Sequence, residues 1–350
     1  MDGDFNVVRW RNVDGLLNQR VLKVEVARPD ILDLGFAYYW LQPFIASVNS
    51  KTAATTVKHL SIRDVQRAVG DLPSIEVQRR IAAILSSLDT AIEATEALIE
   101  KHQQIKAGLM HDLFTRGVLP NGELRPSIDE APSLYADSKL GPVPKEWQVA
   151  TCEAVCERVI DCKNRTPPEA PDGHPVIRTP NVRRGEFVDD ELVYTDAKSY
   201  EDWTARGKPV AGDIVITREA PVGEVCMIPS RHAMACLGQR MVLYRPDARR
   251  IDATFFLFAL QSNAIQSRLD LISGGSTVGH VRVGDIRSLW MYLPSSIEEQ
   301  QRIGSALSAM TARLRADNEV LAKLRMQKQG LMQDLLTGKV RVSVPADAPA

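Results

Sequence analysis

Cysteine is scarce in this sequence, with 5 residues among 350, and long apolar runs are missing. The cysteines are odd in number and all lie between Cys152 and Cys236, which argues against a framework of disulfide bonds. No apolar stretch approaches the roughly 18 residues that a membrane-spanning helix requires, and the first residues are too polar for a secretory signal. We therefore expect a protein of the cytoplasm with no membrane partner.

An excess of positive charge is also lacking. Lys and Arg number 43 against 44 Asp and Glu, so the net charge is -1. A nucleic-acid partner would have to be bound by a local patch of cations, because the chain as a whole is not polycationic. The hydrophobic content of 44% and the charged content of 25% predict a folded protein, and the length suggests about two or three domains.

Signatures of catalytic classes are missing as well. We looked for the NPPY motif of base methylation, for the phosphate-binding loop of ATP-driven enzymes and for a metal-dependent nuclease cluster. The nearest strings fail at a defining position: Asn164 begins NRTPP, Gly207-Lys208 precedes Pro, Gly338-Lys339 precedes Val, and neither Pro171-Asp172 nor Pro246-Asp247 is followed by an acid-x-Lys element. The sequence predicts no catalytic residue and no cofactor bound by this chain itself.

A zinc site is one interpretation of Cys152, Cys156 and Cys162. Their spacing lacks the paired CxxC of a zinc ribbon, and no His follows at a suitable distance. We prefer the interpretation that they are small buried residues, and we expect no metal.

The chain repeats itself. HLSIRDVQRAVGDLP from His59 parallels HVRVGDIRSLWMYLP from His280, IEVQRRIAAILSSL parallels IEEQQRIGSALSAM, and GLMHDLFTRGV parallels GLMQDLLTGKV. Agreement over such distances indicates a duplicated unit. The paired histidines favour a structural role where each domain meets the helix that follows it.

Each copy continues into a long helix, residues 75–115 and 294–338, whose apolar stripe has a period of 3.5. Such a narrow stripe predicts a coiled-coil seam, and we expect the two helices to pair with each other. Two unrelated amphipathic helices, each packed on its own domain, are the alternative. The seam positions are Ile81, Leu85, Leu88, Ile92, Thr95, Ile99, His102, Lys106, Leu109 and Leu113 in the first helix, and Ile303, Leu307, Met310, Leu314, Asp317, Leu321, Leu324, Lys328, Leu331 and Leu335 in the second.

The remaining segments suggest two domains of unequal completeness. Residues 116–146 are rich in Pro, Gly, Ser and Asp and are predicted as an extended linker. Residues 147–293 hold short β-rich runs and one helical run, which predicts a compact α+β domain. Residues 1–74 look like the second part of such a domain, because GDFNVVRW resembles GDIVITRE and Gln19-Arg20 stands opposite Gln239-Arg240. Residues 339–350 form a tail.

These motifs resemble the specificity subunit of type I restriction-modification systems. LPSIEVQRRI and LPSSIEEQQRI look like the family's entry into its conserved helices, and GDIVITREAPVGEVCMIP and GGSTVGH look like parts of its recognition domain. The resemblance implies an α+β fold, in which target-recognition domains with small β-sheets are joined by two long antiparallel coiled-coil helices. Each recognition domain would read one half of a split DNA sequence. This chain departs from the family in its first domain, whose beginning is missing.

The resemblance also implies partners. They are double-stranded DNA, two methyltransferase subunits docked on the paired helices, and restriction and translocase subunits. S-adenosylmethionine, ATP and Mg would be bound by these partners. A homodimer would supply an intact domain for the partial one. The alternative is a coiled-coil scaffold or regulatory protein of the same descent that no longer reads DNA, favoured by the neutral charge and the partial first domain.

Candidate DNA-reading residues lie in HPVIRTPNVRRGEF, because Arg pairs bidentately with guanine and Asn with adenine. The other interpretation is that this segment builds the fold while variable loops read the sequence. Arg218 and the Gly-rich loop around Thr277 are candidates for phosphate contact; a capped turn with an internal ion pair is the alternative, preferred for Arg218. The apolar seam residues are the expected helix and partner interface. The DNA candidates are Arg178, Thr179, Asn181, Arg183, Arg184, Arg218 and Thr277.

Overall fold

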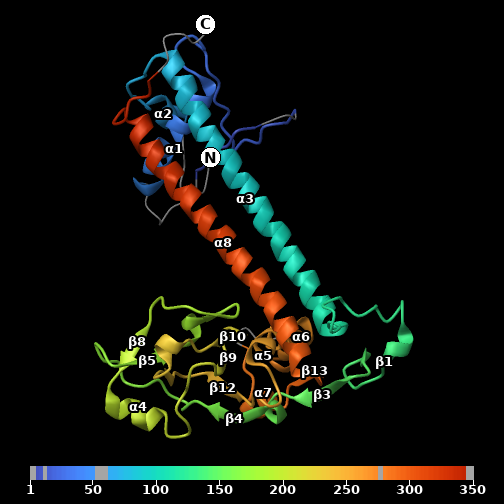
Figure 1. Ribbon diagram of the computed structural model, residues 1–350. Helices are drawn as coiled ribbons and strands as arrows, with labels where there is room; N and C mark the ends of the chain where they lie inside the picture. The colour runs from blue at the N-terminus through green and yellow to red at the C-terminus, as the bar shows by residue number, and fades with distance from the viewer. Residues whose placement is uncertain (1–4, 11–13, 52–61, 275–278, 344–350) are drawn as a thin grey trace. The chain divides into compact units, whose positions relative to one another are not determined.

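The computed structural model describes residues 5–10, 14–51, 62–274 and 279–343. The chain forms two compact units, which we call unit 1 (residues 1–101 and 315–350) and unit 2 (residues 102–314). Two long helices, α3 (Ile75–Thr115) and α8 (Ile297–Leu336), contribute to both units (Figure 1). Helix α8 begins three positions later than expected, because Pro294 ends a strand rather than starting the helix.

Within unit 1, α3 and α8 pack side by side and run in opposite directions. Asp89 pairs with Lys328 at 2.6 Å, and Glu96 pairs with Arg325 at 2.6 Å, so rising numbers on α3 meet falling numbers on α8. Tyr39 donates a hydrogen bond of 2.7 Å to Asp89. Burial and this bond raise the pKa of Tyr39. The Tyr39–Asp89–Lys328 cluster therefore fixes the register of the helix pair by polar contacts.

The seam positions expected from the period of 3.5 all lie buried or half-buried, whereas Leu98, off the seam, is exposed. This confirms the α+β fold class with two long antiparallel helices and excludes the alternative of helices that pack separately. Lys106 is a polar seam residue whose ammonium lies 5.7 Å from the ring centroid of Phe258. Burial lowers the pKa of Lys106. The fully buried seam residues are Ile81, Leu85, Ile99, Leu113, Ile303, Leu307, Asp317, Leu321 and Leu335.

The rest of unit 1 is helical where regular structure is described. Helices α1 (Leu34–Lys51) and α2 (Ile62–Gln66) follow a described stretch that contains no strand. Residues 3–10 and 19–26 resemble two neighbouring strands of unit 2, but only residues 11–18 separate them, against residues 220–238 in unit 2. In the sequence of unit 2, a third strand, Val222–Met227, lies between these two strands. Residues 11–18 are too few to supply a counterpart of it, and an isolated pair of strands is marginal in water.

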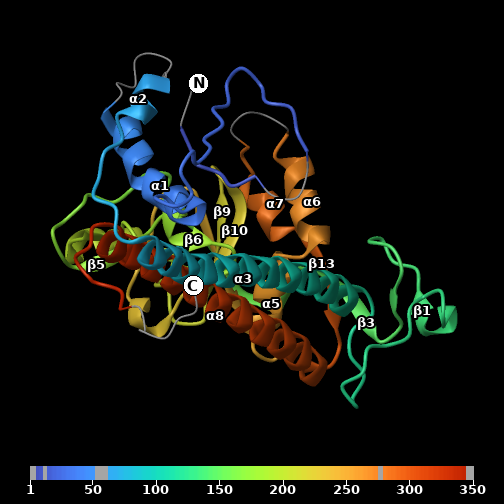
Figure 2. The same ribbon diagram turned by 90° about the horizontal axis from the view of Figure 1, so that it is seen from above.

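Unit 2 is built on a four-stranded antiparallel sheet in the order β10 (Val222–Met227), β9 (Ile214–Arg218), β12 (Met241–Pro246) and β4 (Cys156–Asp161). Helices α5 (Ala253–Leu260) and α6 (Asn263–Ile272) contact β10 (Figure 2). Ile214 and Ile216 face one hydrophobic core and Val215 faces another. Because both faces are covered, β9 is buried along its whole length and begins with three consecutive apolar residues rather than an alternating pattern.

Smaller elements complete unit 2. Pairing of β3 (Trp147–Thr151) with β13 (Trp290–Pro294) joins the beginning of the 147–293 region to its end, directly before α8. The other elements are β1 (Tyr135–Ala136), β2 (Val143–Pro144), β5 (His174–Ile177), β6 (Val182–Arg183), β7 (Glu186–Phe187), β8 (Val193–Thr195), β11 (Cys236–Leu237), α4 (Ala197–Trp203), α7 (Val283–Arg287), and the 3-10 turns η1 (Pro132–Leu134), η2 (Glu153–Val155), η3 (Thr179–Asn181) and η4 (Ser230–His232).

One buried glutamine joins the globular part of unit 2 to α8. The Gln300 side chain is 1% exposed. It accepts a hydrogen bond from the Asp252 amide at 2.8 Å and donates to the carbonyls of Pro294, at 2.8 Å, and Arg250, at 3.3 Å. Asp252 in turn accepts from the Phe255 amide and caps α5. The strand, the cap and the long helix are thus tied together by one amide.

Unit 1 repeats this junction. Gln78 is fully buried, accepts from the Asp33 amide at 2.8 Å and donates to the carbonyls of Ile31 and Pro73, each at 2.8 Å. Asp33 caps the start of α1 through the Phe36 amide. The sequence repeat is therefore a repeat of hydrogen bonding, and α1 occupies the place that α5 has in unit 2.

The 116–146 segment is docked on unit 2, although its prolines predict an extended linker. Glu299 of α8, 5% exposed, accepts hydrogen bonds from the Val118 amide at 3.0 Å, the Arg125 guanidinium at 3.2 Å and the Trp147 indole at 3.2 Å. Arg125 is itself 4% exposed and also pairs with Glu146. The segment contains little regular structure, as predicted, but it belongs to the packed unit.

The Gln300 junction can be tested against its neighbour. Gln300→Ala leaves the Asp252 amide and two carbonyls without their partner, so we expect a loss of about 1–3 kcal/mol of unfolding free energy. Gln301→Ala, at the next and exposed position, should cost less than about 0.5 kcal/mol. Urea unfolding of both variants measures this difference. Equal midpoints would show that the Gln300 hydrogen bonds do not stabilise the fold.

The helix seam is tested on α3. Leu85 is fully buried and Leu98 is 37% exposed. Leu85→Ala should lose about 2–5 kcal/mol of unfolding free energy, because a buried leucine leaves a cavity, whereas Leu98→Ala should change it little. Far-UV circular dichroism during denaturation measures both. A pair of leucines with the same cost would contradict the assigned seam.

Candidate nucleic-acid interface

Two of the predicted arginines lie at the tip of the β6–β7 hairpin. Arg183 pairs with Glu186, which leaves Arg184 and Gly185 as the turn. Their φ angles are 50° and 88°, and a two-residue type I′ turn requires positive φ at both positions. Gly185 meets this requirement without strain, and Arg184 adopts it at some cost. Arg183 and Arg184 are both exposed, so the hairpin carries two adjacent guanidinium groups into solvent.

Three contacts fix the hairpin tip to the edge of the main sheet. The Gly185 amide donates to the Val225 carbonyl of β10 at 2.9 Å, and the Arg184 amide donates to the Glu224 carboxylate at 2.5 Å. A β-carbon at Gly185 would come within 2.8 Å of the Gln261 amide group of α5. The backbone of the tip is therefore held, while the two arginine side chains extend beyond it.

Asn181 is placed inside the segment rather than at its surface. It is fully buried, accepts from the Arg178 amide at 3.0 Å and donates to the carbonyls of Val188, at 3.0 Å, and Asp190, at 3.1 Å. The Asn181 amide is used to close the loop and presents nothing to a base in this conformation.

Arg178 and Thr179 flank this closed loop. Both are half-buried, and the Arg178 guanidinium donates to the Glu191 carbonyl at 2.6 Å. Thr179 begins the turn η3. These two residues lie in the same segment as the hairpin tip but are less accessible than Arg183 and Arg184.

A clamp holds the far side of the segment. Asp189 accepts from Arg231 at 2.7 Å and contacts the His232 ring nitrogen at 2.5 Å. The Phe187 ring lies 4.7 Å from the His232 ring, centroid to centroid. Hydrogen bonds from Arg231 and then His232 lower the pKa of Asp189. The Asp189 carboxylate is thus stabilised in its charged form and ties the hairpin to η4.

Arg218 agrees better with the structural interpretation than with phosphate contact. It is 7% exposed, its guanidinium lies 4.0 Å from the Asp161 carboxylate, and it donates to the Val281 carbonyl at 3.5 Å. Thr277, the other phosphate candidate, lies outside the described residues.

Glu219 follows Arg218 in the sequence, but sequence reasoning did not identify its partners. Glu219 contacts Arg240 at 2.9 Å and His280 at 2.6 Å. A signal for Arg240 was present, since Gln239-Arg240 repeats Gln19-Arg20. The clamp residues Arg231 and His232 gave no such signal, because nothing in the sequence relates them to Asp189.

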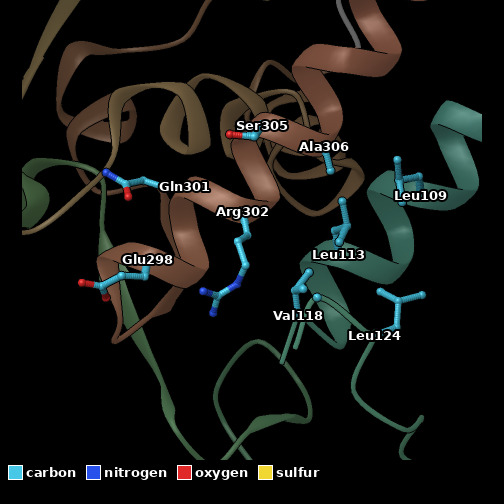
Figure 3. A pocket seen from close by; sticks show the side chains of 10 residues that line it. Leu109, Leu113, Val118, Leu124, Glu298, Gln301, Arg302, Ser305 and Ala306 are labelled. Carbon is cyan, nitrogen blue, oxygen red and sulfur yellow. The ribbon is translucent and has the colours of Figure 1, made fainter. Parts of the chain in front are cut away.

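A groove of about 570 Å³ opens where the ends of the two long helices meet in unit 2. Leu109 and Leu113 of α3, with Val118 and Leu124, form its apolar wall, and Arg302 of α8 extends between this wall and Glu298 (Figure 3). Part of the predicted partner interface is therefore an open apolar surface beside a cation.

The cysteines give no indication of a metal site. All five are free, and burial raises the pKa of Cys152 and of Cys226 to about 12. Their thiolates, the form that binds metal, are therefore disfavoured. Within the part of the chain that the structure describes, His, Cys, Asp and Glu nowhere gather in a group of three or more that would hold an ion.

The same described residues contain no helix that is long and apolar enough to cross a membrane.

Comparisons with known proteins identify relatives of the chain. The profile of the family described as "Type I restriction modification DNA specificity domain" matches residues 1–104 and 144–325. The EcoBI type I restriction enzyme specificity subunit of Escherichia coli is 25% identical over 362 aligned residues, covering 100% of this chain and 74% of that protein. The putative MjaX specificity subunit of Methanocaldococcus jannaschii is 27% identical over 296, covering 82% of this chain and 61% of that protein.

A solved structure shares the fold. The S subunit of a type I restriction-modification system from M. genitalium superimposes with a TM-score of 0.52 at 18% identity, covering 88% of this chain and 73% of that one. The family profile covers the first two repeated stretches of each copy, with Gln78 and Gln300, and also the hairpin with Arg183 and Arg184. The chain belongs to the type I restriction-modification DNA specificity family.

Proposed function

We propose that residues 147–293 form a recognition domain that reads one half of a bipartite duplex target through the β6–β7 hairpin tip. The observation that supports this most is the exposed pair Arg183 and Arg184 on a backbone held by Val225, Glu224 and the Gln261 side chain. A guanidinium fork suits the O6 and N7 acceptors of guanine and the oxygens of phosphate. A rigid tip loses little conformational entropy when it binds.

The chain serves in a type I system as the non-catalytic component that gives DNA specificity, and its partners are DNA and the methyltransferase and restriction subunits. We further propose that it recruits two methyltransferase subunits and that S-adenosylmethionine, ATP and Mg are bound by the partners. Residues 1–74 would then read their half-site weakly unless a second copy of the chain contributes its 147–293 domain.

The two long helices are proposed as the spacer between half-sites. A helix of the length of α3 or α8 spans about 60 Å at 1.5 Å per residue. Seam residues such as Leu85 and Leu307 are used in the helix pair, so methyltransferase would dock on the outer helix faces and on the groove beside Leu109 and Arg302. The neutral net charge is consistent with partners that supply part of the phosphate contact.

The hairpin proposal is tested by alanine substitution. Arg183→Ala or Arg184→Ala should cost about 1–3 kcal/mol of binding and relax one base position if that arginine contacts a base. If it contacts phosphate, all duplexes should weaken alike and the salt slope should fall by about one unit. Methylome sequencing of cells that express each variant with its methyltransferase, and duplex titration at several salt concentrations, give both readouts.

Arg158→Ala is the matched control, because this exposed arginine lies on β4, at the opposite edge of the main sheet from β10. The proposal fails if both hairpin variants methylate the wild-type motif with unchanged strictness and bind with unchanged affinity.

The clamp gives a second test. Asp189→Asn removes the charge that Arg231 and His232 hold, so the hairpin should open more often and its amides should exchange hydrogen faster. Asp190→Asn, at the adjacent exposed position, should leave exchange unchanged. Because the folded pKa of Asp189 is lowered, the clamp's stabilisation is present at neutral pH and is lost as the pH falls through that pKa. Hydrogen-exchange mass spectrometry at pH 7 measures both variants. If the hairpin amides exchange at the same rate in both, the contacts of Asp189 with Arg231 and His232 do not hold the hairpin.

A further inference from the structure

The end of strand β9 carries a charge cluster that the hairpin proposal does not use. The Glu219 carboxylate lies between a guanidinium and an imidazole group, with Arg240 Nε at 2.9 Å from one oxygen and His280 Nδ1 at 2.6 Å from the other. The Glu219 side chain is 20% exposed, whereas those of Arg240 and His280 are 43% and 50% exposed. A largely covered carboxylate thus holds two groups that face solvent.

Backbone contacts keep this group together. Glu219 and His280 form an antiparallel β-bridge, and the Arg218 amide donates to the Arg240 carbonyl at 2.9 Å. Arg240 has a φ of 74°, in the turn directly before β12. The Arg240 and His280 side chains therefore start from fixed backbone positions on either side of Glu219.

The neighbouring charges favour an anion at this end of the sheet. Arg218 lies 4.0 Å from Asp161, and Arg206 lies 3.3 Å from the other oxygen of that carboxylate. With Arg240, three guanidinium groups surround two carboxylates. Removal of the Glu219 charge would increase the excess of positive charge and would leave the exposed Arg240 guanidinium, beside the His280 ring, without its carboxylate partner.

We propose that Glu219 is an internal substitute for a DNA backbone phosphate. In the free protein it occupies the hydrogen-bond donors of Arg240 and His280 and so masks two phosphate-binding groups. Carboxylate and phosphate oxygens accept the same charge-assisted hydrogen bonds, so a duplex that approaches this surface must displace Glu219 before its phosphate can bind there. The inference rests on the proposed DNA-reading function and adds a residue that limits sequence-independent binding.

Such a mask has a physical purpose in a specificity protein. Sequence-independent affinity comes from phosphate contacts and counterion release, and it is the same for every site in a genome. A genome offers about 10⁶ or more non-specific sites that compete with the target for the protein. The background affinity therefore determines how much of the protein is left to bind its target. A carboxylate that competes with phosphate lowers the background and leaves the base contacts of the hairpin untouched.

The test uses the full chain in complex with its methyltransferase and a random-sequence duplex of about 30 bp, which at about 3.4 Å per base pair is longer than either helix. Glu219→Gln retains the shape and removes the charge. It should raise the affinity for random duplex by about eightfold at about 0.1 M salt for each additional phosphate that the protein binds, and steepen the salt slope by about 0.9 per phosphate. Arg240→Ala should have little effect in the wild-type protein but should reverse the increase in the Glu219→Gln background.

Glu201→Gln is the matched control, because it removes the same charge from an exposed pair with Lys208 on α4. The inference is overturned if Glu201→Gln raises affinity as much as Glu219→Gln, or if Glu219→Gln changes neither affinity nor salt slope. A parallel titration separates the two proposals. It uses a duplex that contains the sequence motif that the wild-type complex methylates. If the wild-type complex cannot distinguish this duplex from random DNA, the reading function is refuted. If the wild-type complex does distinguish them, but Glu219→Gln changes neither the affinity for random duplex nor the salt slope, only the proposed mask is refuted.

Discussion

The buried amide of Gln300, and its repeat in Gln78, is the interaction on which the architecture depends. Each amide joins the carbonyl before a long helix to the capped start of a shorter helix in the adjoining domain. An unpaired amide group at such a depth would cost as much as the bond contributes, so the junction either forms completely or is strongly disfavoured. A domain attached in this way cannot rotate freely about its helix. If the long helices act as the proposed spacer, a stiff junction at each end would matter as much as the length of the helix.

The helix pair is held by a combination of apolar and polar contacts. Leucine and isoleucine at the seam provide most of the stabilisation, because their burial is favourable in any register. The Asp89–Lys328 pair with Tyr39 selects one register, since a shift of one turn would bury these charges without partners. In unit 2 the Glu299–Arg125 contact joins the 116–146 segment to the first turn of α8. Helix ends that would otherwise fray are thereby packed.

The parts of the fold that local sequence determines could be predicted, and the parts that distant contacts determine could not. The seam of α3 and α8 follows from the spacing of apolar residues along one helix, and the α+β character of residues 147–293 follows from short β-rich runs. Asn181 had the right chemistry for a base contact, yet its burial depends on Val188 and Asp190 folding back over it. The Asp189 clamp joins residues 42 apart, and the Arg125–Glu299 pair joins residues 174 apart. No periodicity or motif reports such pairs. Residues 5–10 and 19–26 resemble strands of unit 2 but form none, because only residues 11–18 separate them.

The electrostatics of unit 2 explain how a nearly neutral protein is suited to read a polyanion. Most of its cations near the end of the main sheet are held by carboxylates: Arg218 by Asp161, Arg231 by Asp189, and Arg240 by Glu219. These pairs shape the surface while adding little to the long-range attraction for DNA. Arg183 and Arg184 differ, because the nearby carboxylate of Glu224 binds the backbone amide of Arg184 rather than a guanidinium group. The guanidinium groups of Arg183 and Arg184 are therefore exposed at a hairpin whose backbone is held by hydrogen bonds. Under the two proposals, specificity would come from where Arg183 and Arg184 are placed, and general affinity would be kept low by the acids that pair with the other arginines.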